Sequence, residues 1–169
     1  RMSVVLQDTV LFGLTVRENL ALGAASPDDA AMQAAAHAAR IDNFIDRLPR
    51  GYDTPVRQRG ALFSSGERQR LAIARALLRA GSVWLLDDPL AGLDVLTSRA
   101  LADVLLERTA GRTTLWVTHD PDIMARMDWV LSLKAGRVAF SGTPEAHTYW
   151  TAQRTRAAAL AHSAITQEL

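Results

Sequence analysis

Two short stretches of the chain carry residues that could act on a phosphate. The first, residues 63–77, opens with a Ser-Ser-Gly turn and continues into a helix that contains several arginines. The start of a helix presents unpaired backbone N–H groups and the positive end of the helix dipole, which favour an anionic oxygen. The second stretch is an apolar run that ends in Asp87 and Asp88. Carboxylates in this position suit a metal ion and an attacking water.

Each stretch also has a simpler interpretation. Ser64 and Glu67 have the spacing of a capping box, in which the serine caps the helix and the glutamate reaches back to the serine's N–H. Asp87 and Asp88 could form a solvated turn before Pro89. The occurrence of both stretches, close together and in this order, favours the chemical interpretation.

Three apolar runs predict the strands that would position these residues. They do not alternate with polar residues, as expected for parallel strands that are buried on both faces, and they span residues 3–6, 83–86 and 114–117. In open α/β sheets, ligands bind at the carboxyl ends of the strands. The polar residues that follow the three runs are Gln7, Asp87 with Asp88, and His119.

Together, these side chains could support metal-dependent hydrolysis of a phosphoanhydride. Asp87 offers an oxygen to Mg²⁺, directly or through water, and Asp88 could accept a proton from an attacking water. Gln7 could ligate the ion or orient that water. His119 could donate to a γ-phosphate oxygen, although an isolated histidine more often caps a helix or lies on the surface.

The composition limits the class of protein. The chain has 169 residues, of which 49% are hydrophobic and 22% charged, as in an ordinary soluble globular domain. Its net charge of +1 gives no electrostatic reason to expect a nucleic acid or an anionic membrane as a partner. The lack of cysteine excludes disulfides and thiolate metal sites. No apolar run approaches the roughly 18 residues of a membrane-spanning helix.

The two phosphate-related stretches resemble the signature motif and the Walker B motif of ATP-binding-cassette (ABC) ATPases. The resemblance implies that the cofactors are ATP and Mg²⁺, with Asp87 and Gln7 as metal ligands. It further implies that the catalytic residues are Asp88, Gln7, as the Q-loop glutamine, and His119, as the switch histidine. The nucleotide-binding residues of the signature would be Ser64, Ser65, Gly66 and Glu67.

Residues 91–94, Ala-Gly-Leu-Asp, resemble the D-loop, which in the family reaches across a dimer interface. Asp94 would therefore contribute to a nucleotide site. The same residue is also a suitable N-cap for a helix over residues 95–110, with Gly111 closing that helix. Both interpretations of Asp94 can hold at once.

The resemblance implies the α/β fold of the P-loop NTPases, with a parallel sheet and an inserted helical subdomain. We expect the helical signature subdomain over about residues 15–80, a RecA-like core over residues 1–14 and 81–145, and a tail over residues 146–169. Residues 26–29, Ser-Pro-Asp-Asp, predict a capped helix with proline in its first turn. An Ala-rich stretch continues that helix, and apolar residues follow at helical spacing: Ile41, Phe44, Ile45 and Leu48. Residues 129–133 and 138–140, with a turn at Ala135 and Gly136, predict an edge hairpin or terminal strands.

Several segments are similar to ABC exporters rather than importers: residues 7–12, 16–20 and 48–56. In exporters the permease and the ATPase are often fused. The resemblance therefore implies that MgATP is bound and hydrolysed between two such domains to drive export. The partners would be a second ABC ATPase domain, in a homodimer or a heterodimer, and a transmembrane permease domain, with no nucleic acid. The location would be the cytoplasmic face of the inner membrane.

The sequence departs from the family pattern at several points. The phosphate-binding G-x-x-x-x-G-K-[ST] loop does not occur in these 169 residues, and Arg1 leads directly into a strand. We therefore expect a C-terminal part of the domain, without its first strands and P-loop, that has little activity alone. Ser65 replaces a glycine, Glu67 a glutamine and Asp88 a glutamate that is one methylene longer. Gln58 stands where exporters commonly have a glutamate.

Two alternatives remain at this stage. The changes at Asp88 and in the signature favour a degenerate, non-hydrolysing half of a heterodimeric exporter, whereas Gln7, Asp87 and His119 oppose it. A soluble ABC ATPase that acts on chromosomes, DNA repair or ribosomes is the other alternative. Chromosome-type relatives separate the Q-loop from the signature by a long coiled coil, and no heptad pattern lies between them here, so transport is preferred.

Overall fold

The computed structural model describes residues 1–56 and 63–147. The chain divides into two compact units, Arg1–Val117 and Thr118–Leu169. Gln58 and most of the predicted tail lie outside the described residues, so the predictions made for them stay predictions. Among the helices that the structure describes, none is long and apolar enough to cross a membrane.

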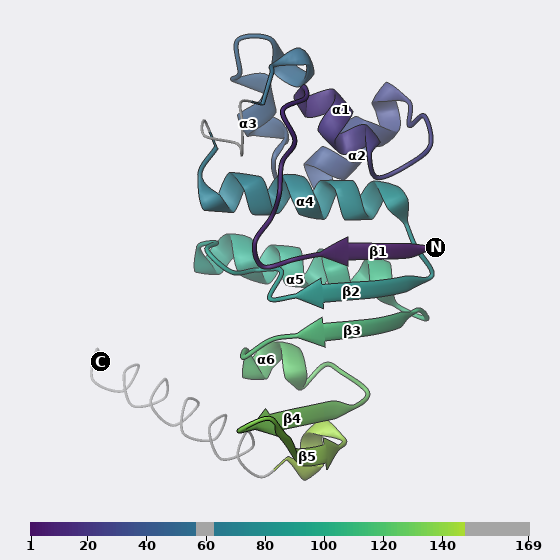
Figure 1. The fold of residues 1–169 in the computed structure, drawn as a ribbon, viewed down its shortest axis with the longest axis vertical. Helices are drawn as coiled ribbons and strands as arrows, with labels where there is room; N and C mark the ends of the chain where they lie inside the picture. The colour runs from purple at the N-terminus through teal and green to yellow at the C-terminus, as the bar shows by residue number, and fades with distance from the viewer. Residues whose placement is uncertain (57–62, 148–169) are drawn as a thin grey trace, which may run out of the picture. The chain divides into compact units, whose positions relative to one another are not determined.

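The first unit is built on a parallel sheet of three strands in the order β1-β2-β3 (Figure 1). The strands are β1 (Met2–Val5), β2 (Val83–Asp87) and β3 (Thr113–Val117). Their register places Val5 beside Leu86, and Leu86 beside Trp116. All three predicted strands are confirmed, with ends that differ by one residue, and their carboxyl ends point to the same edge of the sheet.

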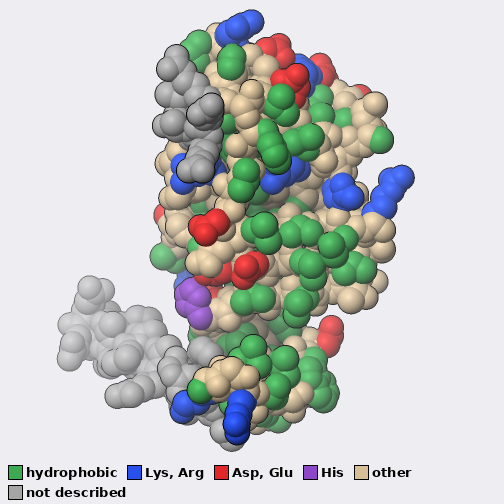
Figure 2. Space-filling view, in the orientation of Figure 1, with side chains coloured by type: hydrophobic (Ala, Val, Ile, Leu, Met, Phe, Trp, Pro, Cys, Tyr) green, Lys and Arg blue, Asp and Glu red, His purple; other side chains and the backbone are tan. Residues whose placement is uncertain are grey.

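The strands are buried on one face only. Val5, Trp84 and Leu86 are each 1% exposed and belong to the same buried cluster as residues of α5 (Val95–Thr109), which runs behind the sheet in Figure 1. On the other face Leu115 remains 61% exposed. Figure 2 shows hydrophobic side chains gathered over the strands on this open face. The prediction of strands buried on both faces is therefore wrong, because the described helices pack against one side of the sheet.

A layer of helices connects β1 to β2. It comprises α1 (Val16–Ala21), α2 (Asp29–Ala38), α3 (Asp42–Asp46), the short 3-10 helix η1 (Gly51–Asp53) and α4 (Ser65–Arg79). This layer has its own buried apolar side chains, which join the core cluster of the sheet. The longest of these helices, α4, packs against both α2 and β1. The layer therefore supports α4 from one side and the sheet supports it from the other.

The predicted helix at residues 26–29 begins later than expected. Asp28 is its N-cap and accepts a 2.7 Å hydrogen bond from the N–H of Ala31, so Pro27 lies outside the helix instead of in its first turn. The helix continues through the Ala-rich stretch and ends at Ala38, just before Arg40, which has a left-handed backbone with φ of 55°. Ile41 and Ile45 are fully buried, as the apolar spacing predicted. They belong to the separate helix α3, in which Ile41 is the N-cap and Ile45 an internal residue.

The second unit contains a short helix and a hairpin. These are α6 (Pro121–Met124), β4 (Val130–Lys134), β5 (Arg137–Gly142) and the 3-10 turn η3 (Pro144–Ala146). Strands β4 and β5 are antiparallel, and the chain reverses at Ala135 and Gly136, both with positive φ. The predicted hairpin is confirmed.

Candidate functional site

The turn that starts α4, residues 63–67, is closed by two reciprocal hydrogen bonds. We call it the α4 turn. The Ser64 side chain accepts from the N–H of Glu67 at 3.2 Å, and the Glu67 carboxylate accepts from the N–H of Ser64 at 2.7 Å. The capping box is therefore confirmed. Because the Ser64 oxygen is the acceptor in this bond, its hydroxyl hydrogen remains available to donate to a ligand.

The turn after β2, residues 87–94, carries the two adjacent carboxylates. We call it the β2 turn. Asp87 is exposed at the end of its strand, and the next residue, Asp88, has a left-handed backbone with φ of 41°. Asp and Asn tolerate this conformation better than most residues. The N–H of Asp88 donates to the carbonyl of Val117 at 3.0 Å, so β3 helps to hold the turn in place.

The β2 turn ends in a helix cap. The Asp94 side chain accepts from the N–H of Thr97 at 3.0 Å and is the N-cap of α5, as predicted. Hydrogen bonds from the side chain and the backbone of Thr97 hold the pKa of the Asp94 carboxyl below its ordinary value. Gly111, just beyond the end of α5, has φ of 70°, which fits its predicted role at the C-terminal end. The capping interpretation of Asp94 is confirmed, and its contact with a nucleotide stays a prediction.

The two turns lie against each other. A Cβ placed on Gly66 would be 3.2 Å from a methyl of Leu93 and 3.3 Å from the carbonyl oxygen of Gly92. Gly92 has φ of 73° and faces Ser65, whose hydroxyl oxygen would be 3.4 Å from a Cβ at that position. The predicted signature and D-loop segments are thus in direct contact within one chain, with little room for a side chain at Gly66.

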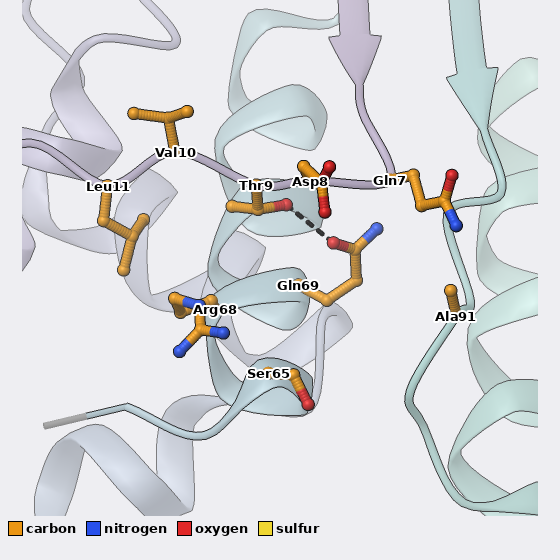
Figure 3. Close-up of a pocket in the computed structure, with 9 residues that line it drawn as sticks. All are labelled: Gln7, Asp8, Thr9, Val10, Leu11, Ser65, Arg68, Gln69 and Ala91. Carbon is orange, nitrogen blue, oxygen red and sulfur yellow. Dashed lines mark hydrogen bonds between the residues drawn. The ribbon is translucent and has the colours of Figure 1, made fainter. Parts of the chain in front are cut away.

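A cavity of about 270 Å³ opens beside the two turns (Figure 3). Three segments line it: the stretch after β1, the first turns of α4 and the β2 turn. The lining residues are Gln7, Asp8, Thr9, Val10, Leu11, Ser65, Arg68, Gln69 and Ala91. The structure therefore brings the predicted Q-loop glutamine, a predicted signature serine and the start of the predicted D-loop to one cavity.

Gln69 is a residue of this site that the sequence interpretation missed. It is 2% exposed, and its amide oxygen accepts from the Thr9 hydroxyl at 2.6 Å. Its amide nitrogen donates to the carbonyls of Leu6 at 3.3 Å and Pro89 at 2.9 Å. A signal was present in the sequence: Gln69 precedes the buried Ala72 and Ile73 by three and four residues, so the helical period places this polar side chain on the buried face.

The residues at the strand ends are of the right type for Mg²⁺. Gln7 follows β1 and Asp87 ends β2, and these two strands are neighbours. No group of three or more His, Asp or Glu side chains that could hold a metal ion occurs in the described part of the chain. Mg²⁺ is usually held by one or two protein oxygens together with substrate phosphates and water. The donor set of an exposed carboxylate and a neighbouring carboxamide fits that mode.

His119 belongs to the second unit. It is exposed and lies between β3 and α6, next to Asp120, which caps α6 by accepting from the N–H of Asp122 at 2.8 Å. The first unit thus contains every other predicted site residue, and the role of His119 stays a prediction.

The chain is similar to known proteins over most of its length. The family model described as "ABC transporter" matches residues 1–91. An ATP-dependent lipid A-core flippase of Alkalilimnicola ehrlichii is 40% identical over 144 residues, which are 85% of this chain and 24% of that protein. The ATP-binding cassette sub-family B member 6 of Rattus norvegicus is 41% identical over 143 residues, covering 85% of this chain and 17% of that protein.

A solved structure of a bacterial Atm1-family ABC exporter with ATP bound matches with a TM-score of 0.83 and 35% sequence identity. The match covers 93% of this chain and 28% of that chain. The chain thus spans about a quarter or less of the length of the two curated relatives.

Proposed function

The chain belongs to the ABC transporter family, and we propose that it is part of an ATPase domain that hydrolyses MgATP to drive export across a membrane. The observation that carries this proposal is the carboxyl edge of the sheet, where Gln7 follows β1 and Asp87 and Asp88 stand at the end of the neighbouring strand β2. Two longer relatives are named as an ATP-dependent flippase and an ATP-binding cassette protein. Their names support the proposal that ATP drives transport.

Each residue has a distinct role in this proposal. Asp87 and Gln7 would hold Mg²⁺, which would supply positive charge to the phosphates. Asp88 accepts a proton from the attacking water. His119 donates to the γ-phosphate as charge builds there.

The α4 turn has a separate role, because it would act on the nucleotide of a second ABC domain. Ser64, Ser65 and Gly66 offer a hydroxyl and helix-terminal N–H groups to the γ-phosphate held by that partner. Glu67 is occupied in the capping box and supports the turn from within. Asp94 would approach the same interface from the end of the β2 turn.

We also propose how the chain is organised in the complete protein and which partners it has there. The described helices between β1 and β2 belong to the helical signature subdomain, and β1, β2 and β3 belong to the RecA-like core. A second ABC domain and a transmembrane domain are the partners, and the ATPase domain lies on the cytoplasmic face of the membrane.

The proposal is tested by Asp87→Asn in the complete protein, reconstituted in lipid vesicles. We expect Mg²⁺-dependent ATP hydrolysis to fall by at least about a hundredfold, because the variant loses a charged metal ligand. Asp46→Asn, which neutralises an exposed carboxylate on α3, is the matched control and should keep the wild-type rate. Equal rates in the two variants would contradict the proposal. Nucleotide binding without any turnover in the wild-type protein would instead favour a degenerate, non-hydrolysing half.

A further inference from the structure

The amide of Gln69 links three segments that carry separate parts of the candidate site. It lies on α4, the helix that begins with the α4 turn. It bonds the carbonyl of Leu6, immediately before Gln7, and the carbonyl of Pro89, immediately after Asp88. Figure 3 shows the side chain between the stretch after β1 and the segment that contains Ala91, with its oxygen directed at Thr9.

A glutamine is chemically suited to this place. Its two N–H donors meet two backbone carbonyls, and its oxygen meets a hydroxyl, so every bond has a donor and an acceptor. The side chain is 2% exposed, and water is therefore a poor substitute for any of these partners. Glutamate would direct a second acceptor at the two carbonyls, and an apolar side chain of the same length would leave both carbonyls without this donor.

The bond to Pro89 also bears on the conformation of Asp88. Asp88 has a left-handed backbone, which costs free energy and persists only where the surroundings hold it. On its N-terminal side the bond from its own N–H to Val117 fixes the residue. On its C-terminal side the bond from Gln69 to Pro89 does so. The backbone at Asp88 is thus held by contacts from two distant segments.

We propose that Gln69 is a positioning residue that sets Gln7 and Asp88 relative to each other and to the α4 turn. It does not touch the nucleotide. Because the α4 turn would serve the partner's nucleotide while Gln7 and Asp88 would serve their own, the amide also links the two sites mechanically. This inference rests on the proposed ATPase function.

Ser3 provides a matched control at the other edge of the sheet. It is fully buried, donates to the carbonyl of Ala76 on α4 at 3.2 Å and accepts from the N–H of Gly81, before β2, at 2.9 Å. It therefore connects β1, α4 and the approach to β2, as Gln69 connects the same elements at the carboxyl edge. Ser3→Ala should lower stability without moving the candidate site.

The experiment measures ATP hydrolysis by the complete protein per nucleotide-binding site, with sites counted by the stoichiometry of bound ATP. In Gln69→Met we expect kcat per site to fall about tenfold or more, since misplacement by about 1 Å can cost about a hundredfold in rate. KM for ATP should stay within about threefold, because the amide does not contact the nucleotide. Ser3→Ala should keep the wild-type kcat per site.

A milder variant keeps the inference testable if Gln69→Met does not fold. Thr9→Val removes only the hydroxyl that bonds the amide oxygen, and we expect a smaller fall in kcat per site with KM unchanged. A wild-type kcat per site in either variant, or an equal fall in Ser3→Ala, would overturn the positioning role. A wild-type protein without ATPase activity would overturn the proposed function instead, so the two failures are distinguishable.

Discussion

The α4 turn and the β2 turn lie in contact but are held by different kinds of interaction. In the α4 turn both hydrogen bonds join Ser64 and Glu67, three residues apart, and the cap residue has an ordinary extended backbone with φ of −60°. In the β2 turn Asp88 and Gly92 have left-handed backbones. There, besides the local turn bonds from Ala91 to Asp88 and from Leu93 to Leu90, supporting bonds come from two distant places: Val117, across the sheet, and Gln69 on α4.

The difference shows which part of the site depends on the rest of the fold. The α4 turn forms from its own sequence, so it should survive changes elsewhere in the chain. The β2 turn needs β3 and α4 in place before Asp88 can be held as it is. We therefore expect the proposed phosphate-binding segment to be robust and the proposed catalytic turn to be sensitive to distant substitutions.

The largest expected effect is that of Asp88→Asn, which removes the carboxylate of Asp88 but keeps a side chain that suits its left-handed backbone. Asp88→Asn should slow single-turnover ATP hydrolysis by the complete protein by at least about a hundredfold, because an amide cannot act as the general base. The melting temperature should not fall, since Asn adopts the left-handed backbone at least as readily as Asp. A variant that loses stability but keeps its rate would show that Asp88 matters only for the turn.

Gly92 tests the conformation of the β2 turn without altering a carboxylate. Gly92→Ala should lower the free energy of unfolding by about 1–2 kcal/mol, because alanine is strained at φ of 73°. The matched control is Gly13→Ala, where nothing lies within 4 Å of the added Cβ. Denaturant unfolding of the two variants gives the comparison. Equal stability would mean that the turn relaxes freely and is not held by its neighbours.

Ser64 tests the locally built turn. Ser64→Ala removes the side-chain cap of α4 and should cost about 1 kcal/mol of stability. Ser65→Ala, at the first helical position, removes a hydroxyl that no hydrogen bond of the capping box uses and should cost much less. Thermal unfolding of both variants measures the difference. An equal loss in the two variants would contradict the assignment of Ser64 as the cap.

These contrasts also explain how far the sequence could predict the structure. The three strands, the α4 turn and the Asp94 cap follow from short patterns, because each depends on residues that are neighbours in the chain. The left-handed Asp88 depends on contacts across the fold, which no local pattern encodes. For Gln69 the helical period indicates burial, but its partners at Leu6, Thr9 and Pro89 are distant in the chain and cannot be predicted from it. The open face of the sheet was missed for a related reason. The three strands carry apolar residues on both faces, a pattern that predicts burial on both, but what covers each face depends on elements elsewhere in the fold.

The smallest expected effect concerns Asp94, whose side chain supports the end of the β2 turn locally, by capping α5. Hydrogen bonds from Thr97 lower its pKa in the folded chain, so the folded state prefers the ionised form. The stabilisation is therefore complete above the ordinary aspartate pKa of about 3.9 and is lost as the pH falls through the lowered value. Asp94→Asn keeps a good capping side chain but cannot titrate.

The measurement is the melting temperature of the wild type and of Asp94→Asn between about pH 7 and about pH 2. The difference between the two melting temperatures should be constant near neutral pH, where Asp94 is fully ionised in both the folded and the unfolded chain. Below about pH 4 the wild type should lose stability that the asparagine variant keeps, so the difference should move in favour of the variant. Glu18, whose pKa is lowered by bonds from the backbone and side chain of Thr15, titrates in both proteins and cancels in the comparison. Parallel curves throughout would mean that the Asp94 cap does not depend on its charge, and that the end of the β2 turn is held, like its middle, by distant contacts.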